Sequence, residues 1–214
     1  MLKNKIILSI IIIVAIAIVS PVVLYVVNSA LNTATTSTNT QEGSVTTTPD
    51  LEEDYGACDL LSTDSIKDTL GEPANSLQAG FDTGRVRVST DSQAQNCVYG
   101  LNERVTAITD DMLTNSFYTT VYLYGTDENK IIGDAYYRDA DTVEDIEDKA
   151  GFAVRTNDES KYVEYELRVD SGLRYFSFSI RLPKDSTSFT ASSAKSALIE
   201  LAKTVDYRAF KDTQ

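Results

Sequence analysis

The longest apolar stretch of the chain, residues 6–27, reads IILSIIIIVAIAIVSPVVLYVV and contains no charged side chain. As a helix it would extend about 33 Å, enough to cross a hydrocarbon core of roughly 30 Å. The apolar region of a cleaved signal peptide is shorter, at about 7–15 residues. We therefore predict a transmembrane signal anchor at residues 6–27. The alternative is cleavage near Ser29 and Ala30, where small residues follow the apolar run.

The residues on either side of this run predict its orientation. Lys3 and Lys5 precede it, whereas the other flank carries no charge until Glu42. Basic residues remain in the cytoplasm under the positive-inside rule. We expect a cytoplasmic stub at residues 1–5 and a single-pass protein of the cell membrane whose C-terminal part is extracytoplasmic.

Residues 28–50 are rich in Ser, Thr and Asn and have almost no large apolar side chains. Such a segment buries too little apolar surface to offset the entropy lost on ordering. We predict a disordered tether that holds a domain of residues 51–214 on the order of 25 Å from the membrane. The tether is either a plain solvated spacer or a carrier of O-linked sugars.

Three helices are predicted in residues 51–214 from their end signals and apolar stripes. Ser62 is placed to cap a helix over 60–73, which Gly71 and Pro73 end. Asp141 followed by Glu144 resembles a capping box and predicts a helix over 141–150. A third helix, over 190–205, carries an apolar stripe made of Ala194, Leu198, Leu201, Ala202 and Val205.

Alternation of side chains predicts the strands. Residues 117–124, FYTTVYLY, form the clearest one, and residues 162–169 and 173–182 predict a hairpin that turns at 170–172. Shorter strands are expected at 85–89, 97–101 and 152–155. No β-α-β alternation is present, so the pattern favours an α+β fold: an antiparallel β-sheet flanked by N- and C-terminal helices and preceded by one transmembrane helix.

The two cysteines, Cys58 and Cys97, both lie in the predicted exported part. An even number of cysteines in an oxidising compartment indicates a disulfide, although two free thiols remain the alternative. Cys-x-x-Cys spacing, which is typical of a redox pair, is absent.

Composition excludes several classes of function. The formal net charge is -13 and the chain has no histidine and no tryptophan. An acidic surface repels nucleic acid and anionic lipid headgroups, so we expect no nucleic-acid partner. Without histidine there is no Ser-His-Asp triad and no His-ligated zinc site. We predict no catalytic, cofactor-binding or metal-binding residue and no cofactor, and we expect a protein that is not an enzyme.

Residues 58–62, Cys-Asp-Leu-Leu-Ser, with Leu70-Gly71 and later Cys97-Val98-Tyr99, resemble a family of actinobacterial secreted lipoproteins of unknown function. Its hallmark is a Cys-x-Leu-Leu helix bridged to a cysteine that opens a strand. The resemblance implies an antiparallel sheet flanked by helices, similar to the extracellular sensor domain of a mycobacterial serine/threonine kinase and to PsbP-like proteins. This chain differs in having a transmembrane segment in place of a lipobox and in lacking a kinase domain.

Two further patterns point to chemistry only weakly. Ser192 and Lys195 fit Ser-x-x-Lys, but no Ser-Asp-Asn or Lys-Thr-Gly motif accompanies them, which favours coincidence within an Ala/Ser-rich helix. Acidic runs at 50–59 and 139–148 offer oxygen ligands for Ca²⁺ without the spacing of an EF-hand. Solvated acidic surfaces are the simpler interpretation.

Four tyrosines on one side of the predicted sheet, Tyr118, Tyr122, Tyr124 and Tyr162, form a candidate interaction surface. The alternative is that they lie beneath a helix. The leading hypothesis for function is a non-catalytic binding module of the cell envelope, anchored in the membrane and binding an envelope protein or a wall polymer. The alternatives are a sensory or accessory subunit of a membrane signalling or transport complex, and a wall-modifying enzyme that uses paired carboxylates.

Overall fold

The computed structural model describes residues 56–89, 92–107, 109, 113–124, 130, 134–156 and 161–210. The predicted stub, transmembrane anchor and tether lie outside these residues and stay predictions. Among the described residues, no helix is both long enough and apolar enough to cross a membrane.

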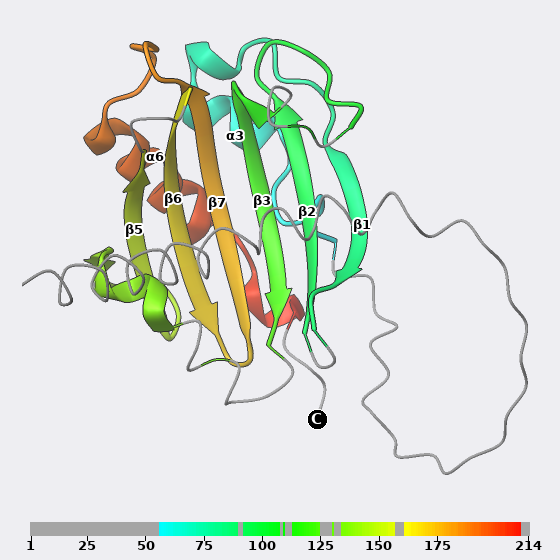
Figure 1. The fold of residues 1–214 in the computed structure, drawn as a ribbon, viewed down its shortest axis with the longest axis vertical. Helices are drawn as coiled ribbons and strands as arrows, with labels where there is room; N and C mark the ends of the chain where they lie inside the picture. Colours follow the sequence, from blue (N-terminus) through cyan, green and yellow to red (C-terminus); the bar gives the residue numbers. More distant parts are fainter. Residues whose placement is uncertain are drawn as a thin grey trace, which may run out of the picture. The chain divides into compact units, whose positions relative to one another are not determined.

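Seven antiparallel strands form one sheet in the order β1-β2-β3-β7-β6-β5-β4 (Figure 1). The α+β class predicted from the sequence is therefore confirmed. The strands are β1 (Phe81–Arg87), β2 (Gln93–Gly100), β3 (Ser116–Leu123), β4 (Asp141–Val143), β5 (Lys149–Arg155), β6 (Tyr162–Ser171) and β7 (Arg174–Pro183).

Two α-helices, α3 (Thr63–Leu70) and α6 (Ala191–Lys203), lie together on one side of the sheet (Figure 1). The side chain of Ser62 accepts a hydrogen bond from the backbone N–H of Ser65, so Ser62 caps α3 as predicted. At α6, Thr190 and Ser193 form a reciprocal capping box. Short 3-10 helices complete the fold: η1 (Glu72–Ala74), η2 (Asp134–Arg138) and η3 (Tyr207–Phe210).

The core lies between the sheet and the two helices. Every second residue of the central strands points into it. The most deeply buried of these are Phe117 and Val121 of β3, Leu167 and Val169 of β6, and Phe176, Phe178, Ile180 and Leu182 of β7. The stripe predicted on α6 packs against them, with Leu198 and Leu201 fully buried. Burial of each large side chain contributes roughly 1.5–3 kcal/mol.

The predicted hairpin of β6 and β7 is present, but its turn is shorter than the one predicted at 170–172. Ser171 pairs with Arg174, so the turn consists of two residues, and Gly172 adopts a φ of 61°. A left-handed φ is strained for residues with a Cβ atom, which explains glycine at this position.

The helix predicted over 141–150 is wrong. Residues 141–143 form the edge strand β4, which pairs with β5, and β5 begins at Lys149. Between them Asp145 and Glu147 have positive φ angles while Ile146 is 5% exposed. Pairing with β5 and burial of Ile146 thus override the local helix signal. Other boundaries also move: β1 and β2 each begin four residues before the predicted strands, β5 begins three residues early, and α3 is shorter than the predicted helix over 60–73.

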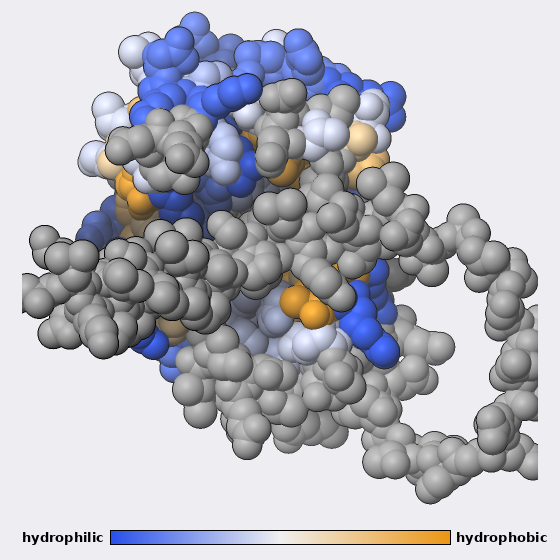
Figure 2. Space-filling view, in the orientation of Figure 1, coloured by the Kyte–Doolittle hydropathy of each residue, from blue (hydrophilic) through white to orange (hydrophobic). Residues whose placement is uncertain are grey.

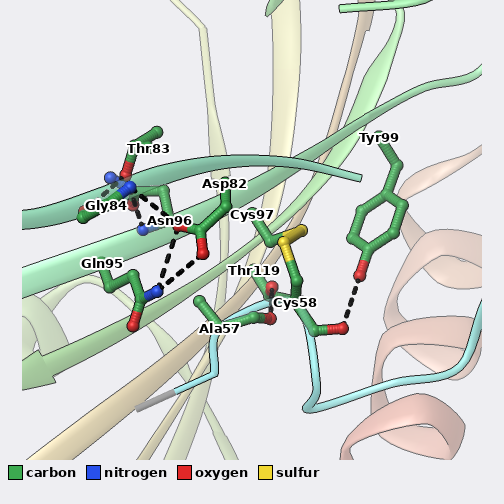
Figure 3. Close-up of a disulfide and its surroundings, with 10 residues drawn as sticks. All are labelled: Ala57, Cys58, Asp82, Thr83, Gly84, Gln95, Asn96, Cys97, Tyr99 and Thr119. Carbon is green, nitrogen blue, oxygen red and sulfur yellow. Dashed lines mark hydrogen bonds between the residues drawn. A yellow bond between two sulfur atoms is a disulfide. The ribbon is translucent and has the colours of Figure 1, made fainter. Parts of the chain in front are cut away.

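The predicted disulfide between Cys58 and Cys97 is present and closes a sequence separation of 39 residues (Figure 3). Backbone carbonyls on the Cys58 side are also held by the sheet. The hydroxyl of Thr119 donates to the carbonyl of Ala57 at 2.7 Å, and that of Tyr99 donates to the carbonyl of Cys58 at 3.2 Å. The start of the described chain is thereby fastened to β2 and β3.

Candidate binding face

The side of the sheet opposite α3 and α6 carries polar and aromatic side chains, and we call it the helix-free face. The alternation that sends apolar residues of the hairpin into the core sends the intervening residues to this side. Its residues are Tyr118, Thr120 and Tyr122 of β3, Tyr175, Ser177, Ser179 and Arg181 of β7, Tyr162, Glu164, Glu166, Arg168 and Asp170 of β6, and Arg155 of β5.

The structure places all four predicted tyrosines on the helix-free side. Tyr118, Tyr122 and Tyr162 are half-buried, whereas Tyr124, just beyond the end of β3, is only 3% exposed. Neither α3 nor α6 covers them, because both helices lie on the opposite side of the sheet (Figure 1). A role in interaction stays a prediction.

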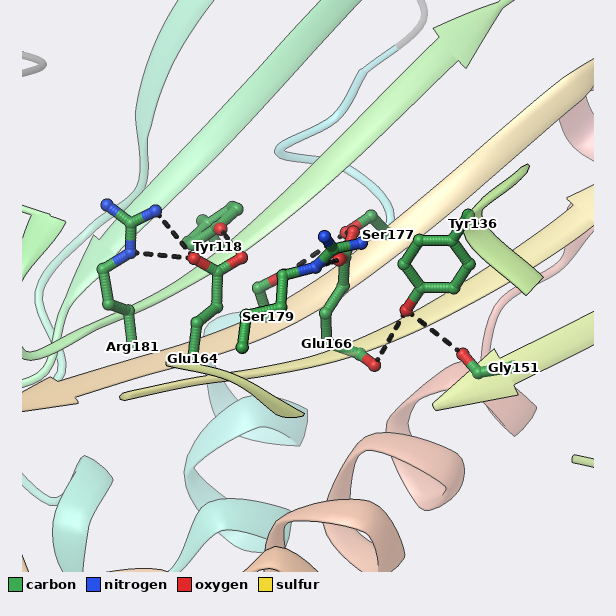
Figure 4. A network of polar contacts seen from close by, with 9 residues as sticks. Tyr118, Tyr136, Gly151, Glu164, Glu166, Ser177, Ser179 and Arg181 are labelled. Carbon is green, nitrogen blue, oxygen red and sulfur yellow. Dashed lines mark hydrogen bonds and ion pairs between the residues drawn. The ribbon is translucent and has the colours of Figure 1, made fainter. Parts of the chain in front are cut away.

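Arg181 and Glu164 form a buried ion pair at one end of this face (Figure 4). We call these two residues, with Tyr118 and Tyr162, the Arg181 cluster. Both Nε and Nη2 of Arg181 donate to Oε2 of Glu164, at 3.0 and 2.7 Å. The hydroxyl of Tyr118 donates to Oε1 of the same carboxylate. The guanidinium of Arg181 also lies 4.2 Å from the ring centre of Tyr162. Each partner therefore fixes the position of the others.

Glu166 lies two residues further along β6, with its oxygens also engaged (Figure 4). Arg155 donates to Oε2 at 2.8 Å and Ser177 donates to Oε1 at 3.1 Å. Burial raises the pKa of the Glu166 carboxyl, while Arg155 acts in the opposite direction. The hydroxyl of Tyr136, from η2, donates to the backbone carbonyl of Glu166 at 3.2 Å, which holds η2 against the sheet.

A second group of aromatic rings surrounds Arg168, which donates to Oδ1 of Asp170 at 3.1 Å. The Arg168 guanidinium lies 4.1 Å from the ring centre of Tyr175 and 5.1 Å from that of Tyr137. Tyr175 in turn stacks on Tyr122, with ring centres 4.8 Å apart and planes inclined by 13°. We call these five residues the Arg168 cluster. Cation–π and stacking contacts of this kind rigidify the rings.

Charge on the helix-free face is balanced. Four ion pairs among the described residues lie on it: Arg155 with Glu166, Arg168 with Asp170, Arg181 with Glu164, and Lys149 with Asp134 of η2. The formal charges of these pairs sum to zero, whereas the whole chain has a net charge of -13. The described residues that are visible in Figure 2, mainly toward the top and the edges of the view, are largely hydrophilic, with small hydrophobic areas between them.

Glu164 and Glu166 are neighbouring carboxylates of the kind a hydrolytic enzyme needs, but all four of their oxygens accept hydrogen bonds from protein donors. These hydrogen bonds hold the surrounding tyrosine, serine and arginine side chains in place.

The Ser-x-x-Lys pattern and part of the acidic run 139–148 have structural partners, whereas most of the run 50–59 lies outside the described residues. Lys195 forms an ion pair with Asp141 at 3.1 Å, and Ser193 belongs to the capping box of α6, so the Ser-x-x-Lys pattern is part of an ordinary helix start. In the acidic run 139–148, Glu147 accepts a hydrogen bond from Ser171 and Asp148 accepts one from Gly172. Among the described residues, no group of three or more His, Cys, Asp or Glu is placed to hold a metal ion.

Sequence reasoning found the tyrosines of β3 and β6 but missed most of this face. It did not predict η2, so Tyr136 and Tyr137 went unnoticed. The charged residues had a readable signal: Glu164, Glu166, Arg168 and Asp170 alternate with the apolar residues of β6.

No protein-family model, curated protein or solved structure matches this chain. The resemblance to actinobacterial lipoproteins therefore stays a prediction, and the case for function depends on the chemistry of the face.

Proposed function

We propose that this protein is a non-catalytic binding module of the cell envelope. Its N-terminal apolar segment anchors it in the membrane, and the helix-free face binds a partner. The observation that carries the proposal is the set of half-buried tyrosines on that face, Tyr118, Tyr122, Tyr136, Tyr137, Tyr162 and Tyr175, fixed by buried arginine–carboxylate pairs.

Tyrosine and arginine are the residues most enriched at the energetic centres of protein interfaces. A ring that is already immobilised loses little conformational entropy on binding, so its contacts yield more net affinity. Solubility alone does not require tyrosine and arginine here, because Thr, Lys and Glu would keep a solvent-facing side of a sheet soluble. The arrangement is therefore better suited to recognition than to solvation.

The test is site-specific photo-crosslinking of the full-length chain in the cells that encode it. The photoreactive residue p-benzoylphenylalanine replaces Tyr122 or Tyr162 on the helix-free face, and in a matched control it replaces Ser192, which is exposed on α6. We expect covalent adducts from the two face positions and none from Ser192. Equal adducts from all three positions, or none from the face, would refute the proposal.

A further inference from the structure

We infer that residues 51–55, Leu-Glu-Glu-Asp-Tyr, dock against the domain that they precede, in a small depression over β1, β2 and β3. We call these residues the strap. The inference does not depend on the proposed function, since it concerns how the domain is joined to the predicted tether. It follows from the depression, from the place where the described chain begins, from a buried acceptor and from charge.

The depression lies on the side of the sheet that α3 and α6 occupy. Val121 and Leu123 give it an apolar lining, and strand alternation places them on the same side as Phe117 and Thr119. The described residues that line it all belong to β1, β2 and β3: Arg85, Gln93, Ala94, Gln95, Val121 and Leu123. The longer helix, α6, packs on β6 and β7 instead. An apolar lining that α6 does not reach favours cover by another segment.

The described chain begins beside this depression. The hydroxyl of Thr119 donates to the carbonyl of Ala57 at 2.7 Å, so Ala57 lies over β3. In Figure 3, Ala57 lies on the Gln95 side of Cys58. Leu123 follows Thr119 by four residues, which is about 13 Å along a strand, and a five-residue strap spans about 17 Å when extended. The strap is thus long enough to follow β3 to its end.

Gln95 gives the depression a hydrogen-bond acceptor without a partner. Its Nε2 donates to both carboxylate oxygens of Asp82, at 3.0 and 2.9 Å. Its Oε1 is buried, points away from Asp82 in Figure 3, and has no hydrogen-bond partner among the residues that the structure describes. A soluble ligand cannot reach an oxygen that is shielded from solvent, so the chain itself has to bring the donor. A backbone N–H of the strap would supply it, because Ala57 lies on this side of Cys58.

The strap and the rim of the depression carry opposite charges. Residues 52–54 are Glu-Glu-Asp. Arg85 lines the depression, Arg87 lies two residues further along β1 on the same side, and both are exposed. At its two ends the strap has Leu51 and Tyr55, whose apolar surfaces match the apolar lining. Complementary charge around an apolar contact favours this occupant over a basic segment.

Photo-crosslinking of the full-length chain tests where the strap lies. The residue p-benzoylphenylalanine replaces Tyr55, and in a matched control it replaces Thr47 of the predicted tether. We expect crosslinks within one chain from position 55 to peptides that contain Gln95 or Val121, at a yield roughly tenfold above that from position 47. Crosslinks from position 55 to other parts of the chain, to a second copy or to another protein would overturn the inference.

Hydrogen–deuterium exchange of the full-length chain in detergent micelles is the second measurement. Amides of residues 52–55 should exchange roughly tenfold more slowly than those of residues 40–48. Arg85→Glu with Arg87→Glu should remove most of this protection, because it places like charges beside the strap, and adding Glu52→Lys with Glu53→Lys should restore it.

The amides of β6 and β7 serve as the folding control and should keep their protection in every variant, because both arginines are exposed. Exchange of residues 52–55 that is as fast as in residues 40–48 would overturn the inference. Protection that is unchanged when both arginines are replaced by glutamate would also overturn it.

Discussion

Replacing Glu164 with Gln leaves the guanidinium of Arg181 buried without its counter-charge. The side chains of Arg181 and Glu164 are 6% and 10% exposed, so solvent screens neither charge effectively. Removing one partner of such a pair destabilises a protein by about 3–5 kcal/mol. The amide introduced by Glu164→Gln would still offer one oxygen to Arg181 or Tyr118, which places the expected loss toward the lower end of that range.

The assay is thermal and urea unfolding of residues 51–214, followed by near-ultraviolet circular dichroism of the tyrosines. At roughly 2–4 °C per kcal/mol for a domain of this size, the melting temperature should fall on the order of 10 °C. As a control, Lys149→Gln breaks an exposed pair whose side chains are 44% and 48% exposed, and should change stability by less than about 1 kcal/mol.

A double variant separates the pair's net contribution from the cost of an unpaired charge. Glu164→Leu combined with Arg181→Met removes both charges, and should recover most of the stability lost in Glu164→Gln. If Glu164→Gln costs no more than the Lys149 control, the ion pair is screened by water and the reasoning about a rigid face fails.

Three further outcomes are expected. Cys97→Ser should lower the free energy of unfolding, measured by urea unfolding, by about 4 kcal/mol, because the unfolded chain regains the conformational entropy of the loop that the disulfide closes over a sequence separation of 39 residues. An unchanged unfolding curve would show that the disulfide does not constrain the unfolded chain. Gly172→Ala should lower the free energy of unfolding by roughly 1–2 kcal/mol, because the backbone φ of 61° is strained for alanine. Gly172→Asn should lower it by less, because asparagine tolerates this backbone conformation, and equal losses for the two variants would contradict the turn geometry. Burial and the nearby Asp59 and Asp82 raise the pKa of Tyr99 to about 12, above its value of about 10 in an unfolded chain. Stability should therefore be retained below pH 10 and decline between about pH 10 and 12, and Tyr99→Phe should weaken that decline in pH-dependent unfolding.

Local signals in the sequence were sufficient for several elements. Ser62 and Gly71 marked α3, and Gly172 marked the turn between β6 and β7, because caps and tight turns depend on a few adjacent residues. The Cys58–Cys97 bridge was predicted from the cysteine count together with the predicted compartment. Side-chain alternation assigned Tyr118 and Tyr122 to one side of the sheet.

Local signals failed where long-range pairing decided the outcome. Residues 141–150 carry a helix-start pattern, yet they form β4 and part of β5, because β5 pairs with β6 and Ile146 is buried. A capping pattern stabilises a helix by only about 1 kcal/mol, which is less than strand pairing and apolar burial together.

The sequence by itself determined which residues of each strand share a side, since side chains alternate with a period of two along any strand. Only the tertiary structure decided which strands are neighbours, and hence that Arg181 meets Glu164 and that Tyr175 meets Tyr122. It also placed both α-helices on the same side of the sheet. On the other side, the charged side chains pair with one another. Strand order depends on contacts between residues distant in the chain, and no short sequence pattern encodes those contacts.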